Sequence, residues 1–406
     1  MAQRTFLHVG PPKTGTTYLQ SGWRQQRQRL AAAGLLYPGS DPADQFRACV
    51  VALDHRVFVP RMDAHHAGTW DRFRAEIDGH DGDALLSSEF YARADPETAA
   101  RIVRQLKEVS DEVRVLITAR DLGRQVLASW QQYVKRCGTR TLQGFWDKHN
   151  ADDATAWKFW RNQDIPALAQ RWLDAGADDV TLVVVGAPDA GHDQVWRDMC
   201  DILDLEHEPL PVPRRSNRSL GAVEVEVLRR INRCLPPGSD RVRSPNLTSK
   251  LYSDRVAELG LPKVPVAVSS QLAEEVRARA GDQVQRLTAM VNDGRVQVVG
   301  ELKHLEARIE PVDSQVDEAL VAEALVAEAS TRMLASMVPD QLRIHDRDRE
   351  LRAEIRRLRA ELRIGASLRR VARRLTRRDD RPGQVPDPTR PVPELPYDAS
   401  PELSGS

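Results

Sequence analysis

Short apolar segments alternate along the first three hundred residues with longer segments in which apolar side chains recur at helical spacing. The apolar segments predict buried strands of a parallel sheet over 4–9, 83–89, 112–120 and 179–186. Helices are predicted over 16–34, 96–110, 123–136, 165–176, 192–205 and 221–235. Strands that alternate with helices in this way favour a three-layer α/β/α fold with a central, mainly parallel sheet.

The pattern changes after about residue 305, where strand segments end and charged helical segments begin. We therefore expect four parts: an α/β domain over 1–305, a helical segment over 306–340, an Arg-rich amphipathic helix over 341–378 and a disordered Pro-rich tail over 379–406. In the Arg-rich helix, apolar residues step by 4, 3 and 4 at Leu351, Ile355, Leu358 and Leu362. This short seam favours a homo-oligomer that forms through a coiled coil. Two alternatives are peripheral contact with anionic lipid and a solvated helical extension. Nucleic acid is not expected as a partner.

Composition indicates the cellular compartment of the protein but not its function. The chain has 59 basic and 59 acidic residues, so net charge indicates no partner. Its four cysteines form no close pair, which argues against disulfides and zinc sites and favours a reducing compartment. No signal-peptide core and no long apolar run is present, so we expect a cytoplasmic protein that is at most membrane-associated.

The segment HVGPPKTGTT at 8–17 joins the first predicted strand to the first helix. A strand–loop–helix junction directs backbone N–H groups at an anion, and threonine hydroxyls add donors. A nucleotide-binding P-loop carries its lysine directly after the second glycine, but Thr16 occupies that place and Lys13 lies inside the loop. Only 8 of the 59 basic residues are lysines, so a lysine at this position is improbable by composition. The expected anion-binding residues are Pro12, Lys13, Thr14, Gly15, Thr16 and Thr17.

A second anion site is predicted where the third strand ends in ITARD. The guanidinium of Arg120 suits a phosphate monoester, which offers two oxygens side by side. A basic segment, RRSNRSLG at 214–221, precedes a later helix and offers Arg214 and Asn217 as further contacts.

The sequence PPKTGTTYLQ closely resembles the 5′-phosphosulfate loop, typically PKSGTTWL, of the sulfotransferases that use 3′-phosphoadenosine 5′-phosphosulfate (PAPS). In this resemblance, Lys13 matches the family's lysine, and Gly15, Thr16 and Thr17 match its phosphate contacts. Arg120 matches the residue that binds the 3′-phosphate. The family places a serine eight residues later; here Ala128 stands there and Ser129 follows, so Ser129, or else Arg124 or Gln125, takes that part.

The resemblance also suggests a general base. Many cytosolic members carry a histidine after the strand that precedes the 3′-phosphate segment, and polysaccharide-modifying branches use a carboxylate. Glu89 holds the equivalent place, while Ser87 replaces the family's second lysine. We expect Lys13 and Glu89 to be catalytic, and Ser87, Ser88 or His8 to contact the sulfonate or acceptor.

The resemblance thus implies transfer of a sulfonate from PAPS, without a metal, to a hydroxyl or amine of a small-molecule, lipid or saccharide acceptor, leaving 3′-phosphoadenosine 5′-phosphate (PAP). The stretch 38–82, taken as loop-rich, is expected to form part of the acceptor pocket. Two other functions stay open, which are a P-loop kinase or NTPase with a variant loop and a non-catalytic nucleotide-binding scaffold.

Overall fold

The computed structural model describes most of the chain up to residue 311 and two later helical segments. The described residues are 1–151, 154–186, 191, 193–208, 210, 220–235, 256, 259, 264–311, 323–334, 343 and 345–357, with the side chains of 154–158 left out.

A six-stranded sheet, in which every neighbouring pair is parallel, forms the centre of the described structure. In spatial order its strands are β2 (Leu35–Leu36), β3 (Asp83–Ser87), β1 (Ala2–His8), β4 (Ser110–Arg120), β5 (Asp179–Val185) and β6 (Gln297–Val299). This confirms the predicted fold class. Because β1 lies between β3 and β4, the carboxyl ends of these three strands meet at one edge, where ligands of open parallel sheets bind.

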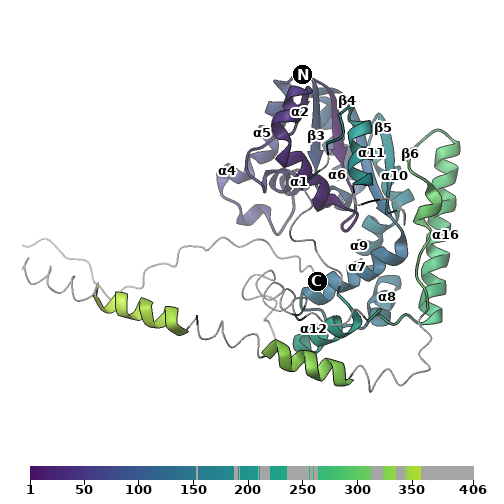
Figure 1. The fold of residues 1–406 in the computed structure, drawn as a ribbon. Helices are drawn as coiled ribbons and strands as arrows, with labels where there is room; N and C mark the ends of the chain where they lie inside the picture. Colours follow the sequence, from purple (N-terminus) through teal and green to yellow (C-terminus); the bar gives the residue numbers. More distant parts are fainter. Residues whose placement is uncertain are drawn as a thin grey trace, which may run out of the picture.

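Helices cover both faces of the sheet (Figure 1). One face packs against α1 (Thr16–Gln25), α2 (Arg27–Ala32) and α11 (Gln194–Ile202). The other face packs against α6 (Pro96–Lys107) and α10 (Ile165–Asp174).

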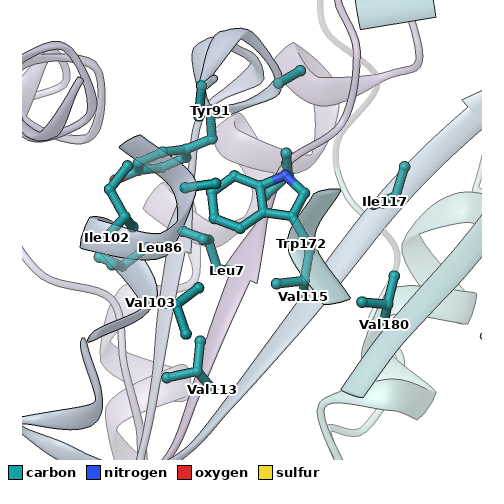
Figure 2. Packing of buried hydrophobic residues seen from close by; sticks show 14 of the residues in the cluster. Leu7, Leu86, Tyr91, Ile102, Val103, Val113, Val115, Ile117, Trp172 and Val180 are labelled. Carbon is teal, nitrogen blue, oxygen red and sulfur yellow. The ribbon is translucent and has the colours of Figure 1, made fainter. Parts of the chain in front are cut away.

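Strand alternation explains the two apolar layers, since successive side chains of a strand point to opposite faces. In β1, Phe6 joins the cluster with α1 and Leu7 joins the cluster with α6. Figure 2 shows the second cluster, where Leu7 lies near Ile102 of α6 and Trp172 of α10. Each such side chain contributes about 1.5–3 kcal/mol when fully buried.

A group of helices extends the molecule below the carboxyl edge of the sheet (Figure 1). It contains α7 (Leu122–Lys135), α8 (Leu142–Asn150), α9 (Ala154–Gln163), α12 (Ala222–Cys234) and α16 (Ser270–Asn292). These helices share an apolar cluster that includes Val126, Trp146 and Leu272. The helical residues 323–334 also contribute to this cluster through Val326 and Met333.

The stretch 38–82 differs from its prediction. It is largely helical and contains α3 (Asp44–Ala52), η1 (Val59–Arg61), α4 (Ala64–Ala67) and α5 (Thr69–Asp78). The expectation of a loop-rich stretch was therefore wrong. In α5, Trp70, Phe73 and Ile77 repeat at helical spacing and are buried, a signal that the histidines and prolines of the stretch obscured.

The structure also differs from the prediction in one helix that is interrupted and in several elements that were not predicted. The helix predicted over 16–34 is interrupted at Gln26 into α1 and α2. The prediction missed the edge strands β2 and β6, the helices α8, α9 and α16, and the 3-10 helices η2 (Glu89–Arg93) and η4 (Leu302–Leu305).

The Arg-rich region is described only in part. Residues 345–357 are helical, and Leu351 and Ile355 of the predicted seam are exposed there. Leu358, Leu362 and the tail lie outside the described residues, so the coiled coil stays a prediction. Across the described residues, no helix is long and apolar enough to cross a bilayer.

Candidate functional site

The loop between β1 and α1 adopts a conformation that few sequences allow. Lys13 has a φ of 75° and Gly15 a φ of 89°, both in the left-handed region. A non-glycine residue in this region stores strain on the order of 1–3 kcal/mol and often marks a functional turn. Gly10 has no room for a side chain, because an added Cβ would lie 2.0 Å from the Thr118 hydroxyl oxygen.

This conformation leaves a run of backbone donors open. In the described part of the chain, the N–H groups of residues 13–17 have no hydrogen-bond acceptor. The last of them belong to the first turn of α1, whose N-terminus carries a partial positive charge. Consecutive open N–H groups at a helix start form an anion-binding cradle.

Lys13 stands beside this cradle. Its Nζ donates a hydrogen bond to Oε1 of Gln132 on α7 at 2.7 Å. It forms no ion pair within the described residues. Desolvation, followed by repulsion from Lys135 and Arg136, lowers the pKa of Lys13 to about 8. A bound anion would relieve this unfavourable environment, because it would supply the missing negative charge.

One face of α7 follows the loop. Gln125, Ser129 and Gln132 are spaced by four and three residues, so they share a side of the helix. Gln125 donates to the carbonyl of Pro12, and Gln132 accepts from Lys13. Ser129 therefore lies on the side of α7 that faces the loop. It follows Ala128, which occupies the position of the family's serine.

Arg120 ends β4 next to the same loop. Arg120, Pro11, Thr14 and Gln125 line one small cavity of about 20 Å³. The Arg120 Nε is buried without a hydrogen-bond partner, and desolvation, then the neighbouring Arg124, lowers the pKa of Arg120. A half-buried guanidinium with an unused, buried Nε–H donor is suited to an incoming anion.

A chain of buried side chains runs beneath the loop. Thr14 Oγ1 donates to the carbonyl of Pro11 at 2.7 Å and lies 2.6 Å from Thr118 Oγ1. His8 Nε2 lies 3.2 Å from Thr118 Oγ1, and His8 Nδ1 lies 2.9 Å from Ser87 Oγ.

The hydrogen positions in this chain follow from one fixed donor. Because the Thr14 proton goes to Pro11, Thr118 must donate to Thr14, and His8 Nε2–H must donate to Thr118. His8 Nδ1 then accepts from Ser87. His8 is fully buried, and desolvation lowers its pKa to about 3, so it is neutral at pH 7. His8 and Thr14 thus use their side chains internally.

Glu89 follows β3 and begins η2. Its carboxylate accepts a hydrogen bond from Gln20 Nε2 at 3.4 Å, and Gln20 reaches Ser87 Oγ at the same distance. The negative charge of Glu89 partly offsets the lowering of the Lys13 pKa, which desolvation dominates. Glu89 also lines a pocket of about 100 Å³ on the side of α1 and α3, together with Ser87, Ser88, Tyr37, Gln45, Phe46 and Gln20.

The remaining predicted contacts are not all placed. Arg214 and Asn217 lie outside the described residues. Thr16 is buried at the start of α1, whereas Thr17 is exposed. No group of three or more metal-ligating side chains occurs among the residues that the structure describes.

Several site residues were missed by the sequence reasoning. Gln132 carried a usable signal, since polar side chains at helical spacing follow a strand-end arginine. Thr118 and Gln20 carried none, because their roles depend on which strands lie side by side.

Comparison with known proteins adds little to the geometry of the site. No protein-family model matches the chain, and no curated protein matches it. Among solved structures, the crystal structure of a sulfotransferase from Alicyclobacillus acidocaldarius aligns with 72% of this chain and 97% of its own, at 16% identity and a TM-score of 0.41. At this level of similarity, the function has to be inferred from the site itself.

Proposed function

We propose that the protein transfers a sulfonate group from PAPS to a hydroxyl or amine of a small-molecule, lipid or saccharide acceptor. The observation that carries this proposal is the run of open N–H groups at residues 13–17 beside Lys13, which has no ion-pair partner among the residues that the structure describes. Arg120 offers a second anion site on the neighbouring strand. A donor with a phosphate at both ends of its ribose would use both sites.

Each part of the donor has a matching group. The loop N–H groups and Lys13 would hold the 5′-phosphosulfate. Arg120, with Ser129 on the loop-facing side of α7, would hold the 3′-phosphate. The strained loop supports this assignment, since strain of this kind is retained where a ligand needs the geometry.

The reaction needs no group beyond those of the site. The acceptor oxygen or nitrogen attacks sulfur, and the bond between sulfur and the bridging phosphate oxygen breaks. PAP leaves with that electron pair, and Lys13 with the loop N–H groups stabilises the growing charge. Glu89 takes the acceptor proton, reached from the adjoining pocket.

Donor binding can be tested by thermal shift with PAP, ATP and GTP. We expect selective stabilisation by PAP, lost in Lys13→Ala and Arg120→Ala because each removes an anion contact. Lys107→Ala and Arg114→Ala serve as controls, since these residues pair with carboxylates elsewhere on the molecule. Stabilisation by Mg-ATP alone would instead favour the kinase or NTPase alternative.

The role of Glu89 can be separated from donor binding. Glu89→Gln keeps the size of the side chain and its contact with Gln20 but cannot accept a proton, so turnover should fall at least a hundredfold. PAP binding should stay within a factor of about three of wild type. Transfer is followed as PAP release with a panel of hydroxyl acceptors. Undiminished turnover would remove Glu89 as the base, and PAP binding without turnover in wild type would favour the scaffold.

A further inference from the structure

The pocket that Glu89 lines has a buried floor and an open rim. Tyr37 and Ser87 in its lining are buried, whereas Arg24 and Asp41 are exposed. Its volume of about 100 Å³ holds several waters, since one water needs roughly 10–15 Å³. The pocket therefore has room for a single small ring beside the proposed base.

The wall of this pocket between β2 and α3 is fixed by two side chains. Gln45 Nε2 donates to the carbonyl of Pro38 at 3.0 Å, and Gln45 Oε1 accepts from the Ser87 N–H at 2.9 Å. Arg27 donates through Nε and Nη2 to the carbonyl of Tyr37 at 3.0 and 2.6 Å. These contacts are made within the protein, so the wall has its shape before a ligand binds.

The hydroxyl of Tyr37 differs from these groups because the fold does not use it. Tyr37 is only 6% exposed, and its ring centre lies 6.1 Å from that of Trp23. Among the described residues its hydroxyl has no hydrogen-bond partner, although solvent still reaches the oxygen. Tyr18, by contrast, donates to Asp193 at 2.6 Å. A phenylalanine would fill the same place without a hydroxyl to desolvate, so this hydroxyl is suited to a ligand.

The charges around the pocket are balanced. Two arginines and two carboxylates line it, which are Arg24, Arg27, Asp41 and Glu89. Next to this lining, Arg47 is shared between Asp41 and Asp44, at 3.0 and 3.1 Å, which adds one charge of each sign. A lining without net charge favours a neutral ligand over an acid or an amine.

The groups that remain open include donors, acceptors and an apolar side. Tyr37 and Arg24 can donate, and Arg24 forms no ion pair within the described residues. Glu89 and the Gln20 amide oxygen can accept, and Gln20 lies one turn before Arg24 on α1, about 6 Å along the axis. Phe46 supplies the apolar side. A ring with several hydroxyls would pair these groups, whereas an acyl chain would leave them without partners.

We propose that the pocket binds a neutral, polyhydroxylated ring, such as a sugar or a cyclitol, and that the Tyr37 hydroxyl selects it through a hydrogen bond to one of its hydroxyls. A second hydroxyl of the ring gives its proton to Glu89 and attacks sulfur. Tyr37 is thus a specificity-determining residue of the acceptor site. This proposal rests on the proposed sulfonate transfer and narrows its acceptor to one class.

The test uses the full-length protein saturated with PAP, so that the donor site is filled. The methyl β-glycosides of glucose, galactose and mannose, and myo-inositol, are compared by calorimetry with tetrahydropyran-2-methanol, which keeps the ring and one hydroxyl. We expect at least one polyol to bind about tenfold more tightly than this alcohol, because the alcohol leaves polar groups of the pocket unpaired. Methyl β-glucuronide should bind no more tightly than the glucoside.

Tyr37→Phe removes the selecting hydroxyl alone. The melting temperature should stay equal or rise, because the hydroxyl bonds to nothing among the described residues. Polyol affinity should fall about tenfold, while the affinity for tetrahydropyran-2-methanol stays unchanged. Tyr133→Phe is the matched control. Its hydroxyl accepts from the Thr139 N–H at 3.2 Å and does not line the pocket, so polyol affinity should be kept.

The outcomes separate the two proposals. Failure to bind PAP overturns sulfonate transfer itself. If PAP binds but no polyol binds more tightly than the alcohol, or if the glucuronide binds more tightly than the glucoside, the neutral polyol is overturned. Unchanged polyol affinity in Tyr37→Phe, or an equal loss for polyol and alcohol, would overturn the role of the hydroxyl.

Discussion

At the scale of single residues, Lys13 combines three unusual properties. It has a left-handed backbone, no ion-pair partner in the described part of the protein, and a pKa lowered to about 8 by desolvation and neighbouring cations. A half-buried lysine of this kind is costly for stability unless a ligand supplies the charge. Its rarity by composition pointed to the position, but its strain and its partner Gln132 are visible only in three dimensions.

The lowered pKa makes donor binding sensitive to pH. The protonated lysine binds an anion and the neutral one does not, so PAP affinity should be full below pH 7 and decline as pH rises through about 8. Between pH 7 and 9 we expect about a tenfold loss, measured by calorimetry. Lys13→Arg, which keeps its charge, should flatten the profile. A pH-independent affinity in wild type would exclude Lys13 as a charged contact.

At the scale of elements, the loop and α7 form one unit. Gln125 and Gln132 of α7 hold the loop at Pro12 and Lys13, while Thr118 of β4 holds it from below. The sequence predicted the strand, the loop and the helix, because each has a strong local pattern. It could not predict that Ser129 shares the loop-facing side of α7, since this depends on the rotation of the helix against the sheet.

Gly10 offers a test of this unit. In Gly10→Ala, the new Cβ would clash with the Thr118 hydroxyl and crowd Nε2 of His8, so the loop must shift. We expect a loss of about 2–4 kcal/mol in the free energy of unfolding and a loss of PAP binding. Gly281→Ala is the matched control, because its Cβ would meet open space within α16 and should leave stability equal or raise it by up to about 1 kcal/mol. Chemical denaturation measures both; equal stability of both variants would contradict the tight loop.

At the scale of the whole molecule, the strand order explains which parts of the sheet and of the candidate site could be predicted from the sequence. The four central strands were predicted from apolar runs, and their order brings the ends of β1, β3 and β4 together. That adjacency unites Lys13, Glu89 and Arg120, which are far apart in sequence. The edge strands escaped prediction because β2 has only two residues and β6 three.

The length of α7 has a consequence for selectivity. Arg120 precedes this helix and Gln132, which contacts Lys13, lies near its end; a packed helix does not stretch. If Arg120 and the loop each hold an anionic group of one ligand, the helix fixes the separation between the two groups. Ligands whose anionic groups stand at another separation would then bind more weakly.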